Sequence, residues 1–294
     1  YSSASFFGPS NWAATFTSCG AANNYQLSPI AFTSTERSSQ TVSYTLQMSR
    51  YEDDTVGKIA FSTSLNAGGL LVSHPNQPFP MKIVNSSNGA ALVMYLLEIA
   101  FHSGAEHTGA QSTVADSNIG MEVHYTFSQT SSGVPTFVFV QQVVSTSLLP
   151  TTGVFVDQSI AYSLMKQVSS SSSLVGSKIP VTTIVELSQT MLLLNTTSTA
   201  SAAVDRSSKA SLAYSGSMTY PLCSAVEMIV CSAVVYIPSS VIHAASTVQP
   251  FTSTRSTQAR VSGLSVRRVS VTEGNPVNAA GTLLYTPAPV QIVP

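Results

Sequence analysis

Charged side chains are scarce in this sequence. The 294-residue chain has 12 lysines and arginines and 13 aspartates and glutamates, so 9% of its residues are charged, whereas a typical soluble domain carries about 25%. Because nucleic acids and anionic membranes attract clustered positive charge, a formal net charge of −1 argues against both as partners. A nearly uncharged surface also repels its own copies weakly, which favours self-association or a glycan coat.

The sequence also lacks a long apolar run. A membrane-spanning helix needs roughly 18 consecutive apolar residues, and the longest apolar stretch, 90–101, is interrupted by Glu98. We therefore expect no transmembrane segment. The sequence opens at Tyr1 without an initiator methionine or a basic-then-apolar leader, which fits either a mature secreted chain or a truncated one.

Serine, threonine, alanine and valine are abundant instead. Hydroxyl-bearing and β-branched residues favour strands and turns, so we predict a β-dominated fold. Helical patterns are short and few, at 159–168 and 238–245. Apolar segments bounded by turn-forming residues predict strands at 43–48, 69–73, 92–102, 120–127, 136–144, 212–218 and 226–236.

The strand pattern continues on both sides of two loop-like segments, a run of five serines at 169–173 and a stretch of small residues at 195–209. Neither segment has the character of a linker, so we predict one domain over residues 1–271. The remaining segment, 272–294, has four prolines and one charged residue. We predict an extended apolar tail that docks on its own domain or on a neighbouring chain, with a free end as the alternative.

Two histidines lie on segments that could pair as strands. Side chains two residues apart on a strand share a face, so Ala100 shares a face with His102 in EIAFHSGAEHT, and Glu122 shares one with His124 in MEVHYTF. If the two strands pair antiparallel, His102 and His124 can converge. Spacing alone leaves open whether they hold a metal ion or fill a core.

Six motifs are spread along the chain: GPSNW at 8–12, CGAANNYQLSPIAF at 19–32, LNAGG at 65–69, EIAFHSGAEHT at 98–108, MEVHYTF at 121–127 and YSGSMTYPLCSAVEMIV at 214–230. In these motifs and in their order, the chain resembles the α-class carbonic anhydrases over roughly residues 6–270. Together with the composition, this resemblance implies a mixed, β-dominated fold. We expect a single domain with a large, mostly antiparallel, twisted central sheet, few short helices and an extended C-terminal tail.

That family hydrates carbon dioxide at a zinc ion held by three histidines. The resemblance places two of these ligands on this chain, at His102 and His124, while the position of the remaining ligand is Ala100, which has no donor atom. The position of the proton-shuttling histidine is Gly69. The resemblance therefore implies a degenerate site without a tightly bound zinc, and we expect no cofactor.

The resemblance also assigns roles around the metal position. Thr219 matches the hydroxyl that orients the zinc-bound hydroxide, and Glu106, followed by His107, matches the carboxylate behind that hydroxyl. Glu122 matches the carboxylate that supports the third histidine ligand. The resemblance thus implies that much of the support remains although one ligand is missing.

Glu98 could replace the missing ligand, since two histidines and one carboxylate form a known metal-binding set. However, four residues of strand, about 13 Å, separate Glu98 from His102, so we expect Glu98 to be at most a supporting carboxylate.

The lining of the cavity also differs from the family: Tyr220 stands where the family has a small threonine, and Thr126 stands where it usually has valine. The larger tyrosine is expected to narrow the cavity.

Cys19 and Cys223 match a pair that forms a disulfide in the secreted branch of the family. Such a bond implies an oxidising compartment, either outside the cell or in a secretory or organelle lumen. Cys231 is left over in an apolar segment and is predicted to be a buried thiol. Asn85 and Asn195 begin glycosylation acceptor sequences, which apply if the chain is secreted.

We therefore predict a catalytically degenerate carbonic anhydrase-like protein that serves as a secreted structural or assembly module, in a homo-oligomer or an extracellular assembly. Two alternatives stay open. One is a zinc-dependent carbonic anhydrase with an altered set of ligands. The other is a binding module that uses the vacated cleft for a small molecule, a glycan or a peptide.

Overall fold

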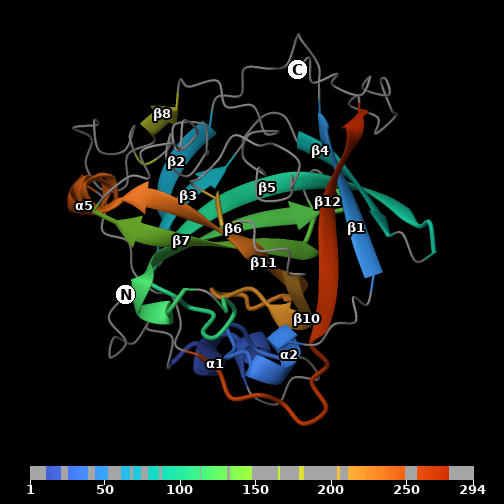
Figure 1. Ribbon diagram of the computed structural model, residues 1–294. Coiled ribbons are helices and arrows are strands. Elements are labelled where there is room, and N and C mark those ends of the chain that lie inside the picture. Colours follow the sequence, from blue (N-terminus) through green and yellow to red (C-terminus); the bar gives the residue numbers. More distant parts are fainter. Residues whose placement is uncertain are drawn as a thin grey trace, which may run out of the picture.

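Strands dominate the computed structural model of the chain, with few short helices, as the composition predicts (Figure 1). The predicted helix at 159–168 lies outside the described residues except for Met165, as do the serine run at 169–173 and most of 195–209. The structure describes residues 11–20, 26–38, 44–51, 61–66, 69–73, 79–85, 88–112, 114–130, 133–147, 165, 179–181, 204–205, 211–248 and 257–277.

The described elements are short helices and mostly longer strands. The helices are α1 (Trp12–Thr15), α2 (Ser34–Ser38) and α5 (Ser239–Val248), with the 3-10 helices η2 (Thr17–Cys19) and η3 (Asp116–Asn118). The strands are β1 (Tyr44–Tyr51), β2 (Phe61–Asn66), β3 (Gly69–Ser73), β4 (Phe79–Asn85), β5 (Ala91–Ser103), β6 (Ile119–Ser128), β7 (Phe137–Thr146), β8 (Ile179–Val181), β9 (Val204–Asp205), β10 (Ser211–Ser217), β11 (Ala225–Pro238) and β12 (Arg267–Val277).

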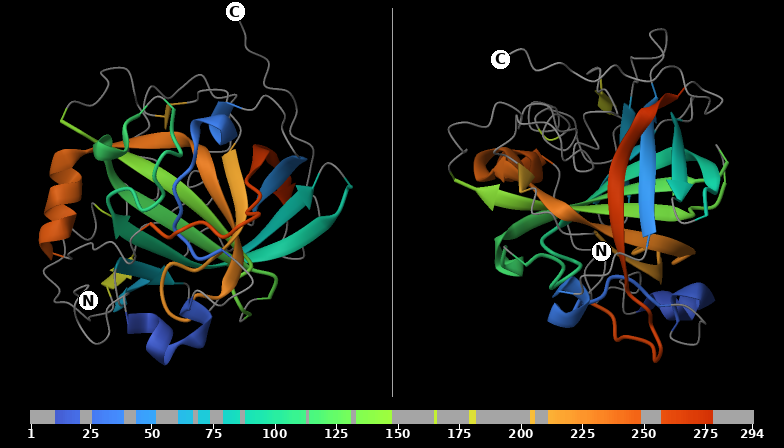
Figure 2. Two further views of the ribbon diagram at one scale, coloured as in Figure 1. Left: turned by 90° about the horizontal axis from the view of Figure 1, so that it is seen from below. Right: turned by 45° about the vertical axis from the view of Figure 1, so that its right-hand side comes forward.

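One twelve-stranded sheet organises the molecule, in the order β4-β1-β12-β10-β11-β7-β6-β5-β3-β2-β8, with β9 paired to β11. The β1–β12 and β7–β11 pairs are parallel, and the other pairings are antiparallel. The mostly antiparallel, twisted sheet is thus confirmed. In Figure 1, β12 and β1 cross the direction of β5, β6 and β7 at a steep angle. Figure 2 shows α5 beside the ends of β7 and β11, and the helix contacts both strands.

The central strands are buried on both faces. Every residue of β6 from Met121 to Ser128 is buried, and so are residues 138–144 of β7. A strand covered on both sides needs a nearly continuous apolar or β-branched run, and the β7 sequence FVFVQQVV departs from this only at its two glutamines. These are the segments where sequence and structure agree best, with each predicted strand found within three residues of its expected ends.

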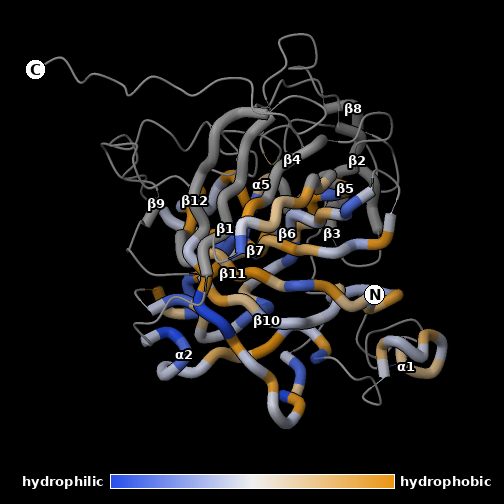
Figure 3. Tube along the Cα trace, turned by 90° about the vertical axis from the view of Figure 1, so that its right-hand side faces the viewer, coloured by the Kyte–Doolittle hydropathy of each residue, from blue (hydrophilic) through white to orange (hydrophobic). Residues whose placement is uncertain are grey.

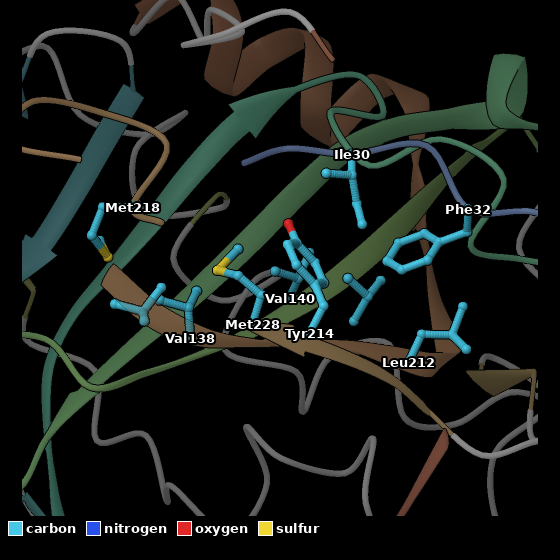
Figure 4. Packing of buried hydrophobic residues seen from close by; sticks show 10 residues of the cluster. Ile30, Phe32, Val138, Val140, Leu212, Tyr214, Met218 and Met228 are labelled. Atoms are coloured by element: carbon cyan, nitrogen blue, oxygen red, sulfur yellow. The ribbon is translucent and has the colours of Figure 1, made fainter. Parts of the chain in front are cut away.

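The main apolar cluster and the predicted site lie on one face of the sheet. Val140 pairs in register with His124, and Val138 pairs with Thr126, so these side chains share a face. The cluster, drawn in Figure 4, comprises Ile30, Phe32, Val138, Val140, Leu212, Tyr214, Met218, Val226, Met228 and Val230. Apolar side chains of β7, β10 and β11 therefore pack on the same face of the sheet as the site.

Outside the central strands the sequence was less informative. β2, β4 and β12 were not predicted, and β12 runs from Arg267 to Val277 through the expected start of the tail at Thr272. Residues 278–294 lie outside the described part, so the tail stays a prediction.

Figure 3 shows hydrophobic stretches along the central strands and hydrophilic residues around α2. No helix within the described ranges is long and apolar enough to cross a membrane.

Candidate functional site

The two predicted histidines meet on neighbouring strands. β5 and β6 pair antiparallel, with Ala100 opposite His124 and His102 opposite Glu122. The His102 and His124 rings lie 4.1 Å apart between centroids, and both side chains are buried. Burial, together with the adjacent His124, lowers the pKa of His102 well below its ordinary value, so the His102 ring is neutral.

Glu122 is the centre of a buried hydrogen-bond network. Its Oε1 accepts from the His107 backbone N–H and from Gln142 Nε2, each at 2.8 Å. Its Oε2 accepts from His107 Nδ1 at 2.9 Å and from His124 Nε2 at 3.2 Å. Burial alone would raise the pKa of Glu122, but the charge of His107 and the hydrogen bonds of His107 and His124 lower it far below its usual range. Glu122 thus remains ionised and orients the His124 ring.

The network continues from His107 to the opposite side of the site. His107 Nε2 hydrogen-bonds the Tyr214 hydroxyl at 2.8 Å, and Tyr214 donates to Ser28 Oγ at 2.8 Å. Ser28 and Ser217 exchange two further bonds, each at 3.0 Å, between the backbone N–H of one and the hydroxyl of the other. A Cβ at Gly216 would lie 2.4 Å from Ser28 Oγ, so glycine is what permits this close approach.

Thr219 and Glu106 do not form the pair that the resemblance implies. The Thr219 hydroxyl is buried and makes no hydrogen bond to a residue in the described part of the chain. The Glu106 carboxylate instead lies beside His102, with 3.6 Å between Glu106 Oε1 and His102 Nδ1. Glu106 is therefore placed against a predicted metal ligand rather than on the threonine hydroxyl.

Glu98 faces Tyr220 rather than a metal ligand. The Tyr220 hydroxyl donates to the Glu98 carboxylate, which links the loop after β10 to β5 at a point two residues before Ala100. Burial raises the pKa of Glu98 to about 7, although the neighbouring Thr126 and His124 act in the opposite direction. Tyr220 also packs against the apolar cluster of Figure 4, so its ring is held at this position.

The donor set does not fit the family's three-histidine zinc centre. Ala100, opposite His124 in the register, offers only a methyl group. Gly69, at the first position of β3, has no side chain that could carry a proton. The resemblance expects a histidine ligand at the first of these positions and a proton-shuttling histidine at the second. The chain therefore cannot build the family's three-histidine zinc site.

Cys19 and Cys223 form a disulfide, as the resemblance implies, with 5.1 Å between their Cα atoms. Trp12 and Leu27 pack around it. Cys231 is a free, buried thiol on β11, as predicted. Its burial raises the pKa of the thiol to about 12. Asn85 ends β4, whereas Asn195 lies outside the described residues.

Sequence reasoning did not single out several members of the site. Tyr214 and Ser28 lie inside motifs that carried the resemblance, but their mutual hydrogen bond joins residues 186 positions apart. The Tyr220–Glu98 contact spans 122 positions. Gln142 did carry a signal, because a polar pair inside the apolar run FVFVQQVV needs partners when buried.

Comparisons with known proteins agree with the fold. The profile of the family described as eukaryotic-type carbonic anhydrase matches residues 7–279. A search of curated protein sequences gave no significant match.

Three solved structures illustrate the likeness of fold. A hyperthermostable carbonic anhydrase from an active hydrothermal vent chimney has a TM-score of 0.62 at 16% identity, covering 92% of this chain and 99% of its own. The α-carbonic anhydrase of Aspergillus oryzae has a TM-score of 0.60 at 17% identity, covering 90% and 95%. Carbonic anhydrase Cah3 from Chlamydomonas reinhardtii, in complex with acetazolamide, has a TM-score of 0.57 at 18% identity, covering 88% and 95%. Because the family profile spans nearly the whole sequence, the chain belongs to the eukaryotic-type, or α-class, carbonic anhydrase family.

Proposed function

We propose that this chain is a carbonic anhydrase-like protein that does not hydrate carbon dioxide and serves as a secreted structural or assembly module. The observation that carries the proposal is Ala100, which faces His124 across the β5–β6 pair without a donor atom. A catalytic zinc needs three protein ligands and one open position for water. Of the three imidazole positions that the family uses, this chain keeps two, so the zinc-bound hydroxide of the family's catalytic centre is not expected here.

Two further features support the loss of catalysis. Gly69 cannot relay the proton that hydration releases at each turnover. The Tyr220–Glu98 hydrogen bond places an aromatic ring between the loop after β10 and β5. We expect a ring held there to narrow the access of a substrate to His102 and His124.

The direct test is carbon dioxide hydration by the full chain with excess Zn²⁺, together with the zinc content of the purified protein. We expect no hydration above the rate of buffer and free zinc. Ala100→His should raise zinc affinity, because the new imidazole would start from the position opposite His124. Ala91→His is the matched control, since Ala91 is exposed on the same strand and should leave zinc affinity unchanged.

The alternative is a zinc-dependent carbonic anhydrase with altered ligands. The intact Glu122–His124 hydrogen bond favours it, because metal-binding histidines usually donate their second nitrogen to such a carboxylate. Hydration by the wild type, with stoichiometric zinc and loss of both in His124→Ala, would establish this alternative in place of our proposal.

The assembly role rests on the charge-poor composition and the apolar segment after β12. Because β12 reaches Val277, the informative truncation ends after Val277, so that the strand is kept. Size-exclusion chromatography with light scattering should give a larger mass per particle for the full chain than for the truncated one. Monomers in both samples would remove the assembly role.

Secretion is supported by the Cys19–Cys223 disulfide, which is compatible with an oxidising compartment. Mass spectrometry of the native protein should find this bond oxidised. If the chain is secreted, the same spectra should report sugar at Asn85 or Asn195. A fully reduced Cys19 in native protein would argue against an extracellular location.

A further inference from the structure

Three metal-binding side chains converge where the family's zinc centre has lost a ligand. His102, Glu106 and His124 can each offer one ligand atom, and these atoms all lie within 4.8 Å of one another. All three side chains are buried, with Glu106 3% exposed. They come from β5, from the bend that follows it and from β6, so two paired strands and one short connection fix the group.

The spacing suits a single ion. Ligand atoms bound at about 2.0–2.2 Å to one tetrahedral ion lie roughly 3.3–3.6 Å apart. Glu106 Oε1 and His102 Nδ1 are separated by 3.6 Å. The other distances between the three ligand atoms are at most 4.8 Å. Side-chain rotations that shorten each of them by at most about 1.5 Å would bring all three atoms to the spacing of ligands on one ion.

His124 is prepared as a ligand by its neighbour. Its Nε2 lies 3.2 Å from Glu122 Oε2, which leaves Nδ1 as the nitrogen that can bind a metal ion. Glu122 is itself held by the His107 backbone N–H and by Gln142 Nε2. This is the support that metal-binding histidines usually have, and it is complete although position 100 has no donor.

We propose that His102, Glu106 and His124 form a binding site for a divalent transition-metal ion, with Glu106 replacing the imidazole missing at position 100. Two imidazoles and one carboxylate suit Zn²⁺, Co²⁺, Fe²⁺ and Mn²⁺, with open positions for water. In this arrangement Glu106 is a ligand and no longer binds the Thr219 hydroxyl, in agreement with its place beside His102. The site goes beyond the proposed function, because a metal held in this way does not require hydration activity.

The test is titration of the metal-free full chain with Co²⁺, followed by its visible absorption, and competition with Zn²⁺ for affinity. We expect one ion per chain, and X-ray absorption of the bound ion should show two imidazole nitrogens and a carboxylate oxygen. Glu106→Gln should weaken Co²⁺ by more than about 100-fold, which exceeds the roughly 10–100-fold cost of losing a group that only supports a ligand.

Two variants separate a ligand from a supporting role. Thr219→Val should change the affinity by less than tenfold, because Glu106 does not act through the Thr219 hydroxyl. Glu36→Gln makes the same carboxylate-to-amide change in the α2 ion pair with Arg260 and should leave metal binding as in the wild type. Thermal unfolding of each metal-free variant checks that the fold is kept.

Absence of stoichiometric Co²⁺ or Zn²⁺ in the wild type, wild-type affinity in Glu106→Gln, or equal losses in Glu106→Gln and Thr219→Val would overturn the proposal. Hydration is measured on the same metal-loaded samples. Activity there would overturn the proposed function and leave the metal site standing, whereas a metal-free, inactive wild type would do the reverse.

Discussion

Two parts of the site have kept very different amounts of the family's chemistry. In the network around Glu122, each carboxylate oxygen accepts two hydrogen bonds, from His107, His124 and Gln142. The positions that would face substrate and metal hold Ala100, Gly69 and a Thr219 hydroxyl without a hydrogen bond in the described part of the chain. The supporting layer is therefore intact, whereas the layer that performs chemistry is incomplete.

The difference follows from what each layer does for folding. A buried polar group must find hydrogen bonds in the fold, or it costs about 1–3 kcal/mol of stability. Glu122 cannot be lost alone, since its loss would leave several neighbours unpaired. An imidazole that only binds metal contributes little to the metal-free fold, so its replacement by alanine at position 100 is tolerated. Folding alone is therefore a reason to keep the support around Glu122, whether or not a metal is bound.

The largest expected effect comes from breaking the intact layer. Glu122→Ala should lower the free energy of unfolding by about 3–5 kcal/mol, because it removes the acceptor of four buried hydrogen bonds and leaves their donors unpaired. Urea unfolding measures the change. Glu227→Ala, in a partly exposed pair with Arg267, is the control and should cost less than about 1 kcal/mol. Similar losses in the two variants would remove the distinction between the layers.

A smaller effect, which depends on pH, is expected from the Tyr220–Glu98 contact. Burial raises the pKa of Glu98 to about 7 from 4.5, so the fold favours the protonated form. The corresponding stability is fully present below about pH 4.5 and is lost as the pH rises through 7. Wild-type protein should therefore lose up to about 3 kcal/mol from this group between pH 4.5 and 8, and Glu98→Gln should remove that loss.

Urea unfolding at several pH values measures this difference, and Glu36 provides a control of opposite sign. The pKa of Glu36 is lowered: its burial acts in the raising direction, but Arg260 and Thr33 outweigh it. Its contribution is present above its ordinary pKa and is lost as the pH falls. Glu36→Gln should consequently flatten the acid side of the profile, whereas Glu98→Gln flattens the neutral side. Parallel profiles for wild type and Glu98→Gln would show that Glu98 ionises normally.

The sequence predicted what depends on local pattern and missed what depends on distant pairing. The runs in β6 and β7 carry their own strand signal, and the motif EIAFHSGAEHT located the site. β12 was missed because residues 272–277 were assigned to the extended tail, and Pro276 disfavours a strand interior. In the fold, β10 pairs with β12 only at Arg267–Val269, so the later part of β12 needs no ladder with β10 and the proline is tolerated. The hydrogen bond of Tyr220 to Glu98 likewise arises only when segments 122 residues apart meet.

The smallest effect, and the one of opposite sign, is expected at Thr219. Its hydroxyl is buried without a hydrogen bond to a described residue, so the fold carries the desolvation cost of a polar group and gains nothing in return. Thr219→Val keeps the shape of the side chain and should raise the free energy of unfolding of the metal-free chain by about 1 kcal/mol. Two residues before Thr219, the Ser217 hydroxyl accepts a hydrogen bond from the Ser28 N–H. Ser217→Ala removes this acceptor and should lower the free energy of unfolding by a similar amount. If both variants destabilise, the Thr219 hydroxyl has a binding partner in the native protein, and the contrast between a satisfied support and an unsatisfied face no longer holds.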